Sequence, residues 1–206
     1  REEEKKSEKA SSPEDKIVES RQSMFLDGQR LTYTSRCGYM KMKDDYGRHK
    51  CDIFFTSYHK DGVKDLNERP IAFCYNGGPG CASMWVHYGC MGPRRVKLTK
   101  KGNFEAPPGR IVDNEFTWLK FTDLVFIDPV SSGYSRPAKD EDPGQFYGIR
   151  QDLESVGKFI RLYVTKYNRW QSPKFLAGES YGTTRSAGLT GILQRDAGMD
   201  LNGIIL

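Results

Sequence analysis

The stretch KFLAGESYG, residues 174–182, joins an apolar run to the pattern Gly-x-Ser-x-Gly, and it decides the fold that we expect. In this pattern a serine follows a buried strand on a turn sharp enough to lift its hydroxyl clear of the backbone, and the flanking glycines let strand and helix pack closely. Residues 183–194 continue as a helix-compatible run. The N–H of Tyr181, at the start of that helix, then faces the point where a substrate oxygen gains negative charge. The stretch predicts a strand, a nucleophile elbow at Ser180 and a helix.

A glycine-rich turn lies upstream of this elbow. Residues 70–75, PIAFCY, have the pattern of a buried strand, and NGGPGC, residues 76–81, follows it directly. In folds built around a nucleophile elbow, a turn of this kind carries the second N–H donor for the oxyanion. A phosphate-binding loop is the alternative, but the segment lacks the Gly-Lys-Ser/Thr ending of such loops, and Pro79 removes one N–H donor. We therefore predict an oxyanion turn.

Four segments, taken in order, resemble the serine carboxypeptidases of peptidase family S10. They are NGGPGC at 76–81, MGP at 91–93, DLVFIDPV at 123–130 with GYS at 133–135, and GESYG at 178–182. The likeness spans about residues 25–206 and looks most like bacterial members in the run GPRRV. Two positions depart from the family pattern. Cys74 stands where a tryptophan is usual, and Cys90 or Met91 stands where an acidic residue is frequent, which affects substrate recognition more than reaction class.

The resemblance implies a role for five residues. Ser180 is the expected nucleophile, and the backbone N–H groups of Gly78 and Tyr181 are the expected oxyanion hole. Asn76 and Glu179 are expected to bind the free C-terminal carboxylate of a peptide substrate. Recognition by Glu179 requires a shared proton, because two ionised carboxylates in contact repel each other. The alternative for Glu179 is a purely structural place in the elbow. No cofactor and no metal is implied.

The remaining members of a catalytic triad are not evident in the sequence. In α/β-hydrolases the acid and the histidine follow the serine, yet no histidine follows Ser180. His49 and His59 flank hairpin loops and are predicted to lie at the surface, whereas His87 lies near the glycine turn and is a weak candidate for a base. We therefore expect the chain to be the N-terminal part of a longer hydrolase and to be inactive alone. An enzyme cut into two chains is the alternative.

Sequence patterns outside the motifs predict an α/β fold. Residues 24–58 have the pattern of a β-meander, with a turn at Asp27-Gly28, and residues 123–128 that of a central parallel strand. Residues 144–170 have apolar side chains at helical spacing on one face, which predicts a helix packed on the sheet. Residues 203–206 predict another buried strand. Together they give a doubly wound, mostly parallel sheet with antiparallel N-terminal strands, incomplete at the C-terminus: an α/β-hydrolase fold.

Composition limits the domains and partners. The 206 residues suffice for one domain with a core. The charged segment 1–22 is predicted to be a disordered tail, with a charged helix as the alternative, and residues 23–206 to be part of the hydrolase domain. The net charge of +5 is spread over scattered residues without a basic, aromatic stripe, which argues against nucleic-acid binding. No apolar run is long enough to span a membrane.

The five cysteines have no zinc-ligand spacing. By the family resemblance, Cys81 is a candidate for a disulfide with a later segment, and reduced, buried cysteines are the alternative. No signal peptide is visible, and the chain starts at Arg1. We expect a secreted or periplasmic protein that acts on peptides with a free C-terminus. An acyltransferase or esterase on the same scaffold, or a non-catalytic fragment, are the alternative functions.

Overall fold

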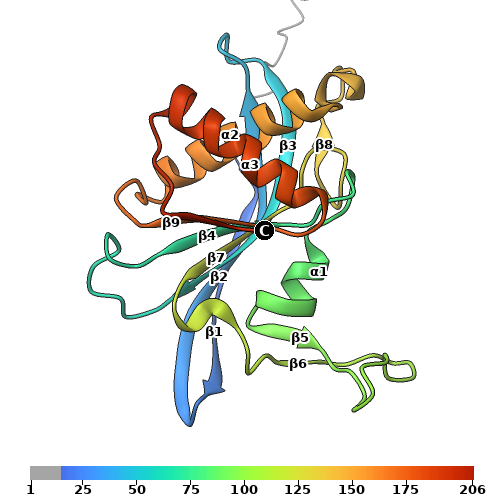
Figure 1. The fold of residues 1–206 in the computed structure, drawn as a ribbon, viewed down its shortest axis with the longest axis vertical. Helices are drawn as coiled ribbons and strands as arrows, with labels where there is room; N and C mark the ends of the chain where they lie inside the picture. The colour runs from blue at the N-terminus through green and yellow to red at the C-terminus, as the bar shows by residue number, and fades with distance from the viewer. Residues whose placement is uncertain (1–14) are drawn as a thin grey trace, which may run out of the picture.

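The computed structural model describes residues 15–206, in which one eight-stranded sheet forms the centre (Figure 1). The strand order is β1-β2-β3-β7-β4-β9-β10, and the short β8 pairs with β3. Helices α2 and α3 lie on one side of the sheet, and α1 with the β5–β6 hairpin lies on the other. The strands are β1 Ile17–Leu26, β2 Gln29–Lys43, β3 His49–Lys60, β4 Ile71–Tyr75, β5 Arg94–Val96, β6 Ile111–Asp113, β7 Asp123–Ile127, β8 Arg136–Pro137, β9 Lys174–Gly178 and β10 Gly203–Ile205. The helices are α1 Met84–Val86, α2 Ile149–Lys166 and α3 Tyr181–Ala197, with shorter turns η1 His87–Met91, η2 Trp118–Lys120 and η3 Pro143–Phe146.

Strands β1, β2 and β3 form the predicted antiparallel meander. Leu26 pairs with Gln29 across Asp27 and Gly28, whose φ values of 50° and 75° are those that a two-residue hairpin turn requires. The structure corrects the predicted tail, because β1 begins at Ile17 and pairs with β2 from that residue onward. None of the side chains from Ile17 to Ser23 is buried, so the backbone ladder rather than apolar burial holds this part of the strand, and composition did not reveal it. The first part of the predicted tail, residues 1–14, lies outside the described residues.

Strands β7, β4, β9 and β10 form the parallel part of the sheet. Every residue of β4 and β7 is buried, as continuous apolar runs in a covered sheet predict. The chain therefore has the expected α/β-hydrolase architecture. The strand predicted at residues 203–206 forms as β10, which pairs with β9, but Ile204 and Ile205 are 40% and 42% exposed rather than buried.

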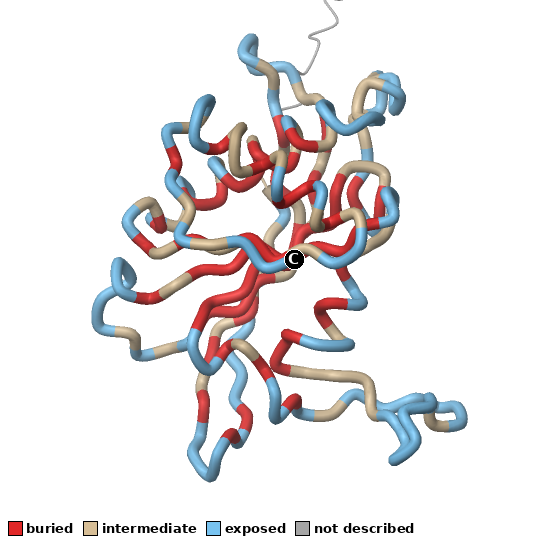
Figure 2. Tube along the Cα trace, viewed as in Figure 1, coloured by how far each residue is buried: buried red, intermediate tan, exposed pale blue. Residues whose placement is uncertain are grey.

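Helix α2 packs its predicted apolar stripe on the sheet. Val156, Phe159, Ile160 and Tyr163 are fully buried against the strands, and Figure 2 shows the buried residues concentrated in the central strands and the facing helix surfaces. The helix is shorter than the predicted 144–170. It starts at Ile149 because η3 forms a separate turn, which Gly148 separates from the helix with φ 95°. Among residues 15–206, none of the helices has the length and apolar character that crossing a membrane requires.

Candidate active site

The elbow predicted from the sequence forms between β9 and α3. Ser180 has φ 58° and ψ −124°, a strained conformation for a residue with a side chain. It is exposed, whereas the strand before it is largely buried. A Cβ added at Gly178 would lie 2.1 Å from the carbonyl oxygen of Gly182, so strand and helix approach too closely for any side chain there. The glycines thus permit the sharp turn that presents the serine hydroxyl.

The glycine-rich turn packs directly against this elbow. Strand β4 lies beside β9, and the N–H of Glu179 donates to the carbonyl oxygen of Tyr75 at 3.2 Å. A Cβ added at Gly77 would lie 2.3 Å from the backbone nitrogen of Tyr181. The next residue, Gly78, is exposed and has φ 101°. The two sequence motifs, far apart in the chain, therefore meet at the carboxyl ends of two neighbouring parallel strands.

Asn76 and Glu179 form a hydrogen bond with each other. The amide Nδ2 of Asn76 donates to Oε2 of Glu179 at 2.9 Å, and its Oδ1 accepts from the backbone N–H of Val86 at 3.1 Å. The second bond fixes the orientation of the amide, because only Oδ1 can accept it. Asn76 is buried, whereas Glu179 is exposed. The pair thus joins the glycine turn to the elbow and leaves a carboxylate at the surface beside Ser180.

Sequence reasoning missed two charged residues behind the elbow, Asp152 on α2 and Arg185 on α3. Nε of Arg185 donates to Oδ2 of Asp152 at 2.8 Å, and Nη1 donates to the backbone carbonyl of Asn76 at 2.7 Å. Arg185 is only 1% exposed. The available signal was an arginine four residues after Tyr181, one helical turn along the face that packs on the sheet. A buried arginine of this kind requires an acidic partner, which its sequence position does not identify.

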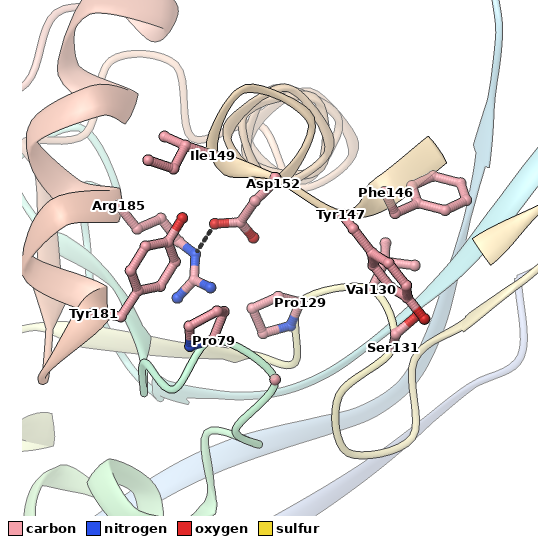
Figure 3. Close-up of a pocket in the computed structure, with 12 residues that line it drawn as sticks. Pro79, Pro129, Val130, Ser131, Phe146, Tyr147, Ile149, Asp152, Tyr181 and Arg185 are labelled. Atoms are coloured by element: carbon pink, nitrogen blue, oxygen red, sulfur yellow. Dashed lines mark hydrogen bonds and ion pairs between the residues drawn. The ribbon is translucent and has the colours of Figure 1, made fainter. Parts of the chain in front are cut away.

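A cavity of about 400 Å³ lies beside the elbow (Figure 3). Its wall includes Pro79 and Gly80 of the glycine turn, Tyr181 of the elbow, and the Asp152–Arg185 pair. Figure 3 shows the Asp152 carboxylate and the Arg185 guanidinium joined on one wall, next to the Tyr181 ring. The carboxylate of Asp152 is therefore balanced by a buried cation. Residues of both motifs, Tyr181 next to Ser180 and Pro79 with Gly80, therefore bound the same cavity.

His87 is buried among aromatic rings on the face of the sheet opposite α2 and α3. Its Nε2 lies 2.7 Å from the hydroxyl of Tyr58, and its ring stacks on Tyr88 and Phe126 with centroids 4.0 and 4.3 Å away. Burial lowers the pKa of His87 to about 3. The imidazole is therefore neutral at ordinary pH. None of these partners belongs to the elbow, so the structure gives no support to a catalytic role.

His59 is also buried, which corrects its prediction as a surface residue. Its Nδ1 lies 3.3 Å from Oδ2 of Asp123, and its Nε2 lies 3.1 Å from the hydroxyl of Ser57 and 2.9 Å from that of Tyr163. Burial lowers the pKa of His59, against the opposing effect of Asp123. His59 lies on the sheet strand β3, and its side chain contacts Tyr163 of α2 and Asp123 of β7, partners that its position beside a loop in the sequence did not indicate. His49, by contrast, is partly exposed and lies 3.0 Å from Asp52.

The described residues 15–206 contain no cluster of three or more His, Cys, Asp or Glu that could hold a metal ion. All five cysteines lie within this range, and all are free. Cys74, at the position where a tryptophan was expected, is fully buried in β4 directly before Tyr75 and Asn76. It therefore presents no large side chain beside the turn.

Most of the chain is similar to known proteins. The family model "Serine carboxypeptidase" matches residues 26–197. Serine carboxypeptidase-like 29 of Arabidopsis thaliana is 27% identical over 189 residues, which cover 88% of this chain and 36% of that protein. The pheromone-processing carboxypeptidase KEX1 of Saccharomyces cerevisiae is 31% identical over 145 residues, which cover 67% of this chain and 18% of that protein.

A solved structure shares the fold. The crystal structure of a prohormone-processing carboxypeptidase from Saccharomyces cerevisiae superposes with a TM-score of 0.59 at 24% identity, covering 82% of this chain and 37% of that one. The chain thus spans about a third or less of the length of these two curated relatives.

Proposed function

The chain belongs to the serine carboxypeptidase family, and from this premise we propose that the complete protein is a serine-type carboxypeptidase that releases C-terminal residues from peptides. One observation carries the proposal. Ser180 stands exposed on a strained turn at the end of buried β9, with the glycine turn packed against it. This is the arrangement that an attacking serine needs, because its hydroxyl must reach a carbonyl carbon while N–H donors face the oxygen.

The proposed reaction proceeds through an acyl-enzyme. The Ser180 hydroxyl attacks the scissile carbonyl, and the N–H groups of Gly78 and Tyr181 stabilise the oxyanion, each by on the order of 3 kcal/mol. The tetrahedral intermediate expels the C-terminal amino acid, and water then hydrolyses the ester. Among the described residues, neither His59 nor His87 hydrogen-bonds to the elbow. We assign the general base and its acid to a histidine and an aspartate outside these 206 residues, as the family order implies.

The hydrogen-bonded pair of Asn76 and Glu179 is the proposed recognition site for the free carboxylate of the substrate. The pair lies beside Ser180, and the Glu179 side chain is exposed to an incoming peptide. The Nδ2 group of Asn76 has a second hydrogen to donate. A proton shared between Glu179 and the substrate carboxylate removes the repulsion of two like charges. The proposed partner is therefore a peptide with a free C-terminus. The proposed location of the protein is secreted or periplasmic.

The first test is covalent labelling of the complete protein with a fluorophosphonate probe. We expect wild type to be labelled and Ser180→Ala to be unlabelled, with loss of C-terminal residue release by about 10⁴- to 10⁶-fold. Ser155→Ala, on α2, serves as the matched control and should behave as wild type. Undiminished labelling of Ser180→Ala would show that another residue is the nucleophile.

The second test distinguishes a carboxypeptidase from an esterase or acyltransferase on the same scaffold. Free-carboxylate peptides should react fastest at acidic pH, where the shared proton is available, and amidated peptides should react poorly at every pH. Glu179→Gln supplies a permanent donor and should flatten the acidic preference. Equal rates on free and amidated peptides would refute carboxylate recognition while leaving Ser180 as the nucleophile.

A further inference from the structure

Arg185 is a fully buried cation whose contacts connect α2, the glycine turn and the elbow. Besides its bonds to Asp152 and to the Asn76 carbonyl, its guanidinium carbon lies 5.2 Å from the ring centroid of Tyr75 and 5.1 Å from that of Tyr181. These partners come from α2, from the end of β4 and from the start of α3. One side chain therefore contacts each of the three segments that meet behind Ser180.

An ion pair alone does not account for this geometry. Asp152 satisfies one edge of the guanidinium, but Nη1 is directed at a main-chain oxygen, 2.7 Å away. That oxygen belongs to Asn76, the first residue beyond the ladder in which Tyr75 pairs with Gly178. Because a peptide unit is planar, holding the Asn76 carbonyl also fixes the direction of the Gly77 N–H and limits the rotation of the turn that follows.

The turn has little other freedom at this point. Gly77 lies so close to the elbow that an added Cβ would be 2.3 Å from the Tyr181 nitrogen and 2.8 Å from the Glu179 carbonyl oxygen. The Asn76 side chain is held by Val86 and Glu179. The contact from Arg185 adds restraint on the main chain at the residue where the turn leaves the strand, two residues before Gly78.

We propose that Arg185 is a positioning residue for the oxyanion turn: through the Asn76 carbonyl it sets the orientation of residues 76–78 against the elbow, and through Asp152 it ties that turn to α2. The proposal rests on the function proposed above for Ser180 and Gly78. Arg185 acts through the backbone and not on the substrate, because its side chain lines the cavity wall in Figure 3 yet is only 1% exposed.

The test compares Arg185→Gln and Arg185→Lys with Arg169→Gln in the complete protein. Arg169 is the matched control, since it is equally buried, pairs with an aspartate and donates to a main-chain carbonyl, that of Arg69. The readouts are melting temperature, the number of active sites titrated with a fluorophosphonate, and kcat and KM per titrated site. Counting sites separates a loss of folded protein from a loss of rate.

We expect Arg185→Gln to lower kcat per titrated site by about 10- to 100-fold with KM within about threefold, because a displaced oxyanion donor weakens binding of the transition state more than of the substrate. Arg185→Lys keeps the charge beside Asp152 but offers no second donor in the fixed fork of a guanidinium. It should recover much of the melting temperature and little of kcat. Arg169→Gln should lower the melting temperature and leave kcat per titrated site unchanged.

Two results would overturn the inference and are distinguishable. If both Arg185 variants melt at lower temperature but keep the wild-type kcat per titrated site, Arg185 is a stability residue, and the function proposed for Ser180 stands. If wild type itself is neither labelled at Ser180 nor able to release a C-terminal residue, the proposed function fails and the positioning role fails with it. Should Arg185→Gln give no folded protein, Arg185→Lys decides the question by the same ratio.

Discussion

The two ends of strand β4 are each held by a buried arginine, but only one end is open to solvent. At the amino end, Arg169 donates to the carbonyl of Arg69 at 2.8 Å and to Asp123 at 2.6 Å. At the carboxyl end, Arg185 donates to the carbonyl of Asn76 at 2.7 Å. Asp123 is completely buried, whereas Glu179 and Ser180 are exposed. The same kind of contact thus lies at a closed end of the sheet and, at the other end, behind the exposed elbow.

The closed end shows why residue types alone do not identify a site. Ser57, His59 and Asp123 are linked in order by distances of 3.1 and 3.3 Å, which is the composition of a catalytic triad. Yet Ser57 is fully buried, and the carboxylate of Asp123 forms ion pairs with two arginines, Arg69 and Arg169. No substrate can reach that serine. In parallel α/β sheets, ligands bind outside the carboxyl ends of the strands, which is where the open end lies.

The largest expected effect on stability comes from removing the buried carboxylate of Asp123 at the closed end. Asp123→Ala leaves Arg69 and Arg169 buried without their carboxylate, and we expect the free energy of unfolding to fall by about 3–5 kcal/mol. Urea unfolding of the complete protein measures it. Asp52→Ala, at a partly exposed aspartate paired with His49, is the control and should cost about 1 kcal/mol or less. A similarly small loss of unfolding free energy in both variants would mean that the ion pairs of Asp123 do not stabilise the fold.

A second effect concerns acid. Because burial lowers the pKa of His87 to about 3, the unfolded chain binds more protons than the folded one between that value and about 6.5. The stability contributed by neutral His87 is complete above about pH 6.5 and is lost as pH falls toward 3. Each pKa unit corresponds to about 1.4 kcal/mol, so the total reaches several kcal/mol.

Unfolding free energies at pH 7, 5 and 4 test this expectation. His87→Gln retains a partner for Tyr58 and removes the titration, so its stability should depend less on pH than that of wild type. His49→Gln is the control at a partly exposed histidine. Parallel curves for His87→Gln and wild type would contradict the prediction. The two ends are linked by this result. Acidic pH is proposed to favour substrate binding at Glu179, and the same pH lowers the stability of the core around His87.

The smallest effect lies at the open end. Ser180 occupies φ 58° and ψ −124°, a conformation that glycine adopts without strain. Ser180→Gly should raise the free energy of unfolding by about 1 kcal/mol while abolishing labelling. Ser180→Ala keeps the Cβ and therefore the strain, which makes it the matched control. Equal melting temperatures for the glycine and alanine variants would show that the elbow stores no strain.

Much of the fold followed from local sequence. Asp27-Gly28 predicted the first hairpin, the continuous apolar runs predicted β4 and β7, and the glycine pattern around Ser180 predicted the strand, elbow and helix. Strand β1 could not be predicted in full, because its first residues bury few side chains and are held by backbone pairing with β2. The start of α2 was also missed, since Gly148, with a positive φ, interrupts a pattern that otherwise continues.

What the sequence by itself determined about this protein is its family, its elbow and its glycine turn, because each depends on residues adjacent in the chain whose backbone preferences are local. Only the tertiary structure decided which polar groups meet. It paired Asn76 with Glu179, directed Arg185 at the Asn76 carbonyl, and buried His59 under α2. These contacts join residues far apart in sequence, and burial of a charged or polar group is possible only where the folded chain supplies its partner.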